Sequence, residues 1–237
     1  MQTFAEISRE VCLRLENKRP ISLAVFGSGT GTNLEALLNH QKQTSLFDIE
    51  IVVTDRPCRC LEIAGVHDIP IIFHSYSEFR AHYSGMNLRE SYDTNTVALI
   101  DTHCVQNKST IDLVVLAGYM RLISTPLLNY FNHRIINIHP ADLEIKDVSG
   151  RRLYIGTNAV YEALIAGEKR TRSTIIQVNE KVDDGPILGF GPWVDYLEGN
   201  PVTEEKARIH QNKQKHESDW PGLIQVIEKI ARGEVQL

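Results

Sequence analysis

The chain of 237 residues is 42% hydrophobic, carries a net charge of -5 and has an isoelectric point near 6.0. This is the composition of one large globular domain or two small ones, and not that of a disordered chain. The negative net charge argues against a nucleic-acid-binding scaffold, because such proteins usually carry a basic surface.

Cysteine spacing and hydropathy exclude further classes of protein. Cys58 and Cys60 are separated by one residue, whereas a zinc knuckle has two, and no second pair follows them. We therefore expect no metal, and free thiols in a reducing cytoplasm. No run of 18 apolar residues is present to cross a membrane, and residues 1–18 lack the apolar centre of a signal peptide. Neither a membrane nor a nucleic acid is expected as a partner.

Apolar residues recur at helical spacing across residues 3–17, which predicts an amphipathic helix that ends at Pro20. From there to residue 140, short apolar runs alternate with helical patterns. Strands are expected at residues 21–26, 49–53, 69–73, 113–117 and 135–138, and helices at residues 33–40, 61–66 and 87–106.

The pattern changes after residue 140. A helix is predicted over residues 154–166, strands over 173–178 and 187–191, and a final helical region over 202–232 that Pro221 interrupts. Apolar strands that alternate with helices indicate an α/β fold, with a mostly parallel sheet flanked by helices on both faces.

Polar segments follow three of these predicted strands, at residues 27–33, 118–123 and 137–140. In an open parallel sheet, ligands bind in the crevice outside the carboxyl ends of the strands. The three segments are therefore expected to meet at one binding site.

One of these segments, residues 137–140, and the later stretch Val182–Pro186 suggest acid–base chemistry. Asn137 and His139 stand in Asn-Ile-His-Pro directly after a strand, and Asp183 stands in Val-Asp-Asp-Gly-Pro. An amide donor, an imidazole and a carboxylate together can stabilise a developing oxyanion and shuttle a proton. On these residues alone, a strand end followed by ordinary turn residues remains an open alternative.

The run Gly27–Asn33 joins the first strand to a helix. Glycines let the backbone approach an anion, and a helix start adds free N–H groups and the positive end of a dipole. The run is neither a dinucleotide fingerprint, because Thr32 occupies the third glycine position, nor a P-loop, because it lacks lysine. It predicts a phosphate site; the alternative is a tight turn with Thr32 or Asn33 as the helix cap.

Gly118–Ile123 offers an aromatic ring, a thioether and the charge of Arg121 just past a buried strand. A flat heteroaromatic ligand could lie there, with Arg121 free to meet a carboxylate. The alternative is a loop that packs on the core. Arg89 lies on a predicted helix, where a charge that simply faces solvent is the alternative to a functional role.

Taken in order, these segments resemble the folate-dependent formyltransferase family, over roughly residues 21–233. The matching stretches are Ser28–Leu34, Val114–Arg121, Asn137–Pro140, Gly156–Gly167 and Val182–Pro186. The resemblance implies a Rossmann-like formyltransferase fold in a single domain over residues 1–237. Within it, residues 1–20 would be a helical extension, 21–125 a phosphate-binding half, and 126–237 a catalytic and folate-binding half.

The resemblance also implies a reaction: transfer of a formyl group from 10-formyltetrahydrofolate to the amine of glycinamide ribonucleotide, in the one-carbon chemistry of purine biosynthesis. Alternatives are a formyltransferase for another amine, such as an amino sugar nucleotide, or a formyltetrahydrofolate hydrolase. Small molecules would be the substrates of a cytoplasmic monomer or homodimer.

Roles for single residues follow from the same resemblance. Asn137 and a protonated His139 would donate hydrogen bonds to the formyl oxygen, while Asp183 keeps the imidazole charged and relays a proton. The expected binding residues are Gly31, Thr32 and Asn33 for the phosphate, Glu217 for the amine, and Arg89, Met120, Arg121, Leu122, Ile123, Asn179, Glu180 and Val182 for the folate.

Overall fold

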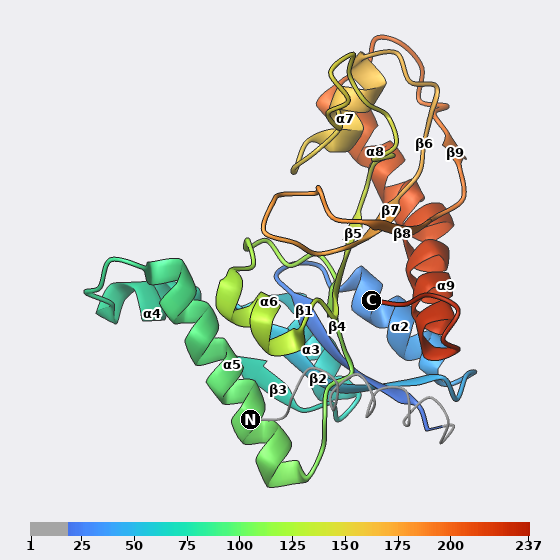
Figure 1. The fold of residues 1–237 in the computed structure, drawn as a ribbon. Helices are drawn as coiled ribbons and strands as arrows, with labels where there is room; N and C mark the ends of the chain where they lie inside the picture. Colours follow the sequence, from blue (N-terminus) through green and yellow to red (C-terminus); the bar gives the residue numbers. More distant parts are fainter. Residues whose placement is uncertain (1–18) are drawn as a thin grey trace.

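The computed structural model describes residues 19–237 (Figure 1), so the helix predicted for residues 3–17 lies outside the described part. Its centre is a seven-stranded sheet in the order β3-β2-β1-β4-β5-β7-β8. The strands are β1 (Ile21–Gly27), β2 (Phe47–Thr54), β3 (Ile71–Phe73), β4 (Leu113–Leu116), β5 (Ile135–His139), β7 (Thr174–Gln177) and β8 (Ile187–Phe190). The strands from β1 to β5 pair in parallel, and β7 and β8 join in antiparallel pairing. The predicted α/β fold with a mostly parallel sheet is confirmed.

Helices lie on both faces of this sheet, with α2 and α9 on one side and α5 and α6 on the other (Figure 1). A small two-stranded sheet of β6 (Arg170–Thr171) and β9 (Val194–Asp195) stands apart from it. The helices are α2 (Thr32–Gln41), α3 (Arg59–Val66), α4 (Tyr76–His82), α5 (Leu88–Asn107), α6 (Thr125–Phe131), α7 (Ala159–Ile165), α8 (Glu204–Gln214) and α9 (Trp220–Ala231).

Two apolar clusters explain this arrangement. Leu37 of α2 and Val226 of α9 pack with Val25 of β1 on one face, while Phe131 of α6 packs with Phe26 on the other. Successive strand residues point to opposite faces, so a strand covered on both sides must be apolar throughout. This is why the inner strands could be recognised as continuous apolar runs.

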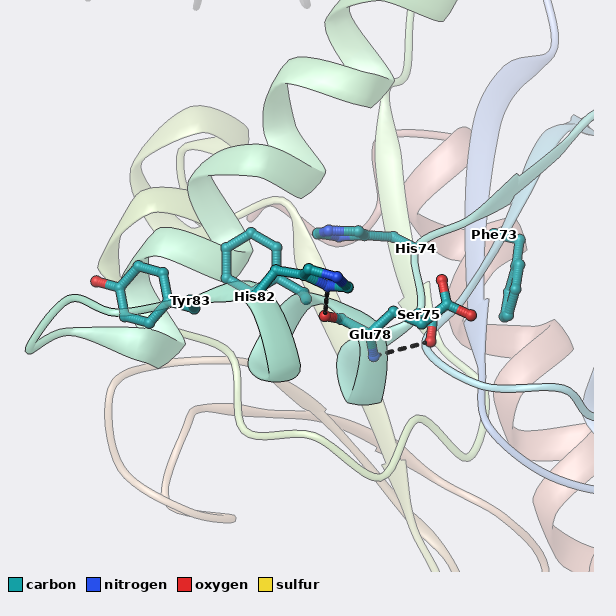
Figure 2. Close-up of a pocket in the computed structure, with 7 residues that line it drawn as sticks. Phe73, His74, Ser75, Glu78, His82 and Tyr83 are labelled. Carbon is teal, nitrogen blue, oxygen red and sulfur yellow. Dashed lines mark hydrogen bonds between the residues drawn. The ribbon is translucent and has the colours of Figure 1, made fainter.

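Two short helices, α4 and α6, were not predicted. Each has seven residues, too few for an apolar period to stand out. Local signals are present nevertheless: the Ser75 hydroxyl accepts a hydrogen bond from the Glu78 amide at 3.3 Å (Figure 2), and Pro126 stands in the first turn of α6.

The predicted helix over residues 154–166 starts too early. Helix α7 begins only at Ala159, and Gly156 has a left-handed backbone with φ of 78°. The Tyr154 carbonyl accepts a hydrogen bond from a histidine ring on β5. The segment before α7 is therefore an irregular loop whose backbone groups face the end of the central sheet.

The final helical region is continuous, contrary to the predicted break at Pro221. A π-helical turn over Lys215–Asp219 connects α8 directly to α9, and Pro221 lies in the first turn of α9. Proline lacks an N–H and its ring crowds the carbonyl four residues earlier in an ordinary α-helix. The wider π turn before Pro221 relieves this conflict without ending the helical region.

The turn after β1 and the turn after β4 are bonded to one another. The Ser28 amide donates to the Gly118 carbonyl at 3.2 Å, and the Met120 amide donates to the Ser28 hydroxyl at 3.0 Å. Two of the three predicted polar segments therefore lie side by side at one edge of the sheet. No helix within residues 19–237 is both long and apolar enough to cross a bilayer.

Candidate active site

A cavity of about 530 Å³ lies at the carboxyl ends of β1, β4 and β5. This volume is in the range of sites for small molecules. The predicted site residues that line it are Gly31, Thr32, Asn33, Arg89, Met120, Arg121, Leu122, Ile123, Asn137, His139, Asn179, Glu180, Val182 and Asp183. The sheet thus brings together the three polar segments that follow its strands and the later turn that carries Asp183.

His139 ends β5 with its side chain almost fully buried. Its Nε2 atom is 2.7 Å from the Tyr154 carbonyl oxygen, and its Nδ1 atom is 3.4 Å from Asp183 Oδ2. A carbonyl only accepts hydrogen bonds, so Nε2 carries a hydrogen. That leaves Nδ1, beside Asp183, as the nitrogen that gains or loses a proton.

Burial lowers the pKa of His139 below its ordinary value of 6.5, and the positive charge of Arg152 acts in the same direction. The Asp183 carboxylate and the Tyr154 carbonyl raise this pKa, but less than burial lowers it. Asp183 thus acts in the predicted direction, by favouring the charged form of the imidazole, while burial opposes it.

Asp183 is held in position by the loop that precedes α7. Its Oδ2 atom accepts a hydrogen bond from the Gly156 amide at 2.9 Å, and its backbone carbonyl accepts one from the Arg152 guanidinium. Arg152 also donates to the Gly185 carbonyl at 2.9 Å. Asp183 itself has a left-handed backbone with φ of 50°. The contribution of Arg152 could not be recognised from the sequence, because no motif marks an arginine that bonds to backbone carbonyls.

The Asn137 side chain is available to a ligand. It is partly exposed, lines the cavity, and makes no hydrogen bond to any residue of the described part. An unengaged amide next to a buried imidazole is the kind of donor that can stabilise negative charge on a carbonyl oxygen.

The glycine turn after β1 has the features of an anion site. Gly31 has φ of 69°, and a Cβ placed there would lie 2.5 Å from Ile63 Cδ1, so any other residue would be strained at this position. Gly31 is also the N-cap of α2, and no side chain caps this helix. The alternative of Thr32 or Asn33 as the cap is therefore wrong. The buried Asn33 Oδ1 has no hydrogen-bond partner among the described residues, which marks a polar position open to a ligand or water.

The two arginines at the cavity differ in their surroundings. The Arg121 guanidinium stacks on the Tyr76 ring, 3.1 Å from its centroid, so it is not free as predicted. Arg89 is exposed in the first turn of α5, where the helix dipole disfavours a cation. An exposed cation held at this unfavourable end of a helix is available to a ligand carboxylate.

Glu217, predicted to contact the amine, does not line the cavity. Its side chain is 51% exposed and lies 3.9 Å from the Lys213 ammonium. The acid that the π turn presents to the cavity is Asp219, only 6% exposed. The sequence alone could not distinguish the two acids, because a π turn has no recognisable pattern.

A second hollow of about 350 Å³ lies between the end of β3 and α4 (Figure 2). The buried imidazole of His74 lines this hollow, and its Nδ1 atom is hydrogen-bonded to the Thr96 hydroxyl at 2.8 Å. Burial lowers the pKa of His74 to about 4. The other lining residues are Phe73, Ser75, Glu78, Phe79, His82 and Tyr83. None of the predicted site residues lies there, and residues 19–237 hold no cluster of three metal-ligating side chains. The larger cavity is therefore the candidate active site.

Known proteins resemble this chain in sequence. The sequence profile described as "Formyl transferase" matches residues 21–220. Phosphoribosylglycinamide formyltransferase of Mycobacterium tuberculosis (strain ATCC 25618 / H37Rv) is 32% identical over 197 residues, covering 83% of this chain and 81% of the relative. The enzyme of that name from Bacillus subtilis (strain 168) is 29% identical over 214 residues, covering 89% and 97%.

Solved structures give the same result. Glycinamide ribonucleotide transformylase 1 from Symbiobacterium toebii superposes with a TM-score of 0.72 at 28% identity, covering 92% of this chain and 91% of that one. The residues that the sequence profile matches include all those that line the cavity. The chain belongs to the formyl transferase family.

Proposed function

We propose that this protein transfers a formyl group from 10-formyltetrahydrofolate to the amine of glycinamide ribonucleotide, a step of purine biosynthesis. The observation that carries the proposal is the convergence of Asn137, His139 and Asp183 on a cavity that also contains a glycine turn and a helix start. The names of the relatives, phosphoribosylglycinamide formyltransferases, support the same reaction.

The three central residues suit the chemistry of acyl transfer. When the amine attacks the formyl carbon, the formyl oxygen gains negative charge, and the free amide of Asn137 is positioned to donate to it. One such donor is typically worth about 2.7–4 kcal/mol of the barrier. The Nδ1 atom of His139 and the Asp183 carboxylate, 3.4 Å apart, form the pair that carries a proton from the amine to the folate nitrogen.

The other predicted binding residues that line the cavity divide into two regions. Gly31, Thr32 and Asn33 would bind the ribonucleotide phosphate through the start of α2. Arg89, at the start of α5, would meet the carboxylates of the folate tail. The pterin ring would lie among Met120, Arg121, Leu122, Ile123, Asn179, Glu180 and Val182.

The activity assay uses purified protein with 10-formyltetrahydrofolate and, in parallel, glycinamide ribonucleotide, an amino sugar nucleotide or no acceptor. We expect tetrahydrofolate and formylated glycinamide ribonucleotide to appear in equal amounts, measured by absorbance and mass spectrometry. Formylation of the amino sugar instead would reassign the acceptor. Formate release without an acceptor would indicate a hydrolase.

Asn33→Asp is expected to raise the KM for glycinamide ribonucleotide by about 10- to 100-fold, because it adds a negative charge beside the proposed phosphate site. The KM for 10-formyltetrahydrofolate should not change. Asn129→Asp, on the exposed surface of α6, adds the same charge away from the cavity and serves as the control. Steady-state kinetics with both substrates varied measure the effect, and an unchanged nucleotide KM would argue against the phosphate role.

A further inference from the structure

Asp219 is a buried carboxylate with few partners. Its Oδ1 atom accepts one long hydrogen bond, 3.4 Å from Gln214 Nε2, and its Oδ2 atom accepts none from the described residues. None of the ion pairs formed within residues 19–237 includes it. Taking a carboxylate out of water with so little pairing is unfavourable, so its position calls for an explanation.

Asp219 has no evident structural role. It immediately precedes α9, but it has helical dihedral angles and its side chain caps no backbone amide. Burial raises its pKa to about 7, although Gln214 and the positive charge of Lys215 act in the opposite direction. The other charged or titratable side chains that line the same cavity are Arg89, Tyr119, Arg121, His139, Glu180, Lys181, Asp183 and Lys215. Perturbed acids in a cleft are candidates for function.

The π turn over Lys215–Asp219 determines which acid reaches the cavity. A π turn places more residues in each turn than an α-helix, and such turns often occur at functional sites. Along this turn, Glu217 points to solvent, whereas Ser218 and Asp219 are buried. The cavity therefore receives the carboxylate of Asp219 in place of that of Glu217.

A buried polar network fixes the amide that faces Asp219. Gln214 Oε1 accepts a hydrogen bond from the Thr171 hydroxyl, which in turn lies 2.8 Å from His210 Nε2. Because its oxygen is engaged there, the Gln214 amide directs its N–H groups to the Pro140 carbonyl, at 2.7 Å, and to Asp219. Pro140 directly follows His139, so a single amide group links Asp219 to the catalytic end of β5.

We propose that Asp219 binds the amino group of the formyl acceptor and removes its excess proton, an inference that rests on the proposed function. An α-amino group has an ordinary pKa of about 7.7–8.0, so much of the acceptor arrives as ammonium near neutral pH. The carboxylate of Asp219 takes one proton, and the neutral nitrogen then bonds to the formyl carbon while the bond from that carbon to the folate nitrogen breaks. A second amine proton passes through the His139–Asp183 pair to the folate nitrogen, which balances the reaction.

The test compares Asp219→Asn with Glu217→Gln, two changes that remove a charge with little change of shape. We expect Asp219→Asn to lower kcat/KM for glycinamide ribonucleotide by about 100-fold, the effect of losing a buried charged partner of a ligand. Its affinity for tetrahydrofolate and its Tm should not fall, and Asp219→Glu should restore part of the activity. Glu217→Gln should behave as wild type.

Two results would overturn the inference: wild-type kinetics in Asp219→Asn, or a parallel loss of Tm and tetrahydrofolate affinity, which would show a structural acid. Calorimetric titration with glycinamide ribonucleotide separates this inference from the proposed function. If the wild type formylates no amine and yet Asp219→Asn binds the nucleotide about 10-fold more weakly, the reaction is misassigned but the amine contact stands. If the wild type and Asp219→Asn gave the same titration curve, Asp219 would not contact the amine.

Discussion

His139→Ala is expected to lower kcat for formyl transfer by about 10³-fold, within the range that a positioned acid–base group contributes. The variant loses the nitrogen that lies 3.4 Å from Asp183, so the carboxylate no longer has a partner through which to pass a proton. Folate binding should persist, because the proposed pterin residues are on other turns. Stopped assays give kcat, and fluorescence titration gives the affinity for tetrahydrofolate.

His82→Ala is the matched control, since this exposed imidazole on α4 faces the smaller hollow (Figure 2). It should leave both kcat and folate affinity unchanged. A His139→Ala protein that turns over at the wild-type rate would refute the assigned acid–base role. A variant that no longer binds tetrahydrofolate would show that the imidazole mainly maintains the cavity.

Gly185→Ala is expected to reduce both stability and activity. A Cβ at this position would lie 1.7 Å from the Gln177 carbonyl oxygen, so the backbone must move. Overpacking of this kind typically costs about 1–3 kcal/mol of unfolding free energy. The moving turn also carries Asp183, and a displacement of about 1 Å in a catalytic group can cost roughly 100-fold in rate. Urea denaturation and kcat measure the two effects.

Gly65→Ala provides the contrast, because a Cβ there meets no atom within 4 Å and the residue lies inside α3. Alanine is favoured over glycine within helices by about 0.5–1 kcal/mol, so this variant should be slightly more stable and fully active. If Gly185→Ala matched it in stability and rate, the turn would have to be far more adaptable than its contacts indicate.

Most strands of the central sheet could be predicted from the sequence, because a strand that is buried on both faces is a continuous apolar run. Leu113–Leu116 is buried at every position, so its apolar run was unambiguous. Helices α4 and α6 are too short to show a period, and their evidence lay only in Ser75 and Pro126. The loop before α7 was mistaken for helix, because its conformation depends on the contact of Tyr154 with His139, far away in sequence.

Site residues could be predicted where a sequence motif follows directly after a strand. They could not be predicted where the local backbone conformation determines which side chain reaches the cavity. Asn137 and His139 follow directly from the position of β5 in the sheet. That Asp219 reaches the cavity and Glu217 does not depends on a π turn. The stacking of Arg121 on Tyr76 depends on helix α4, which was not predicted. The burial that lowers the pKa of His139 likewise requires the packed structure.

The loop before α7 has a consequence for protein engineering. Arg152, Tyr154 and Gly156 give the His139–Asp183 pair a guanidinium, a carbonyl and an amide, and two of these three groups belong to the main chain. Grafting only the catalytic side chains onto another scaffold would leave behind the groups that orient them. The smallest transplantable unit must therefore include this loop together with the catalytic side chains.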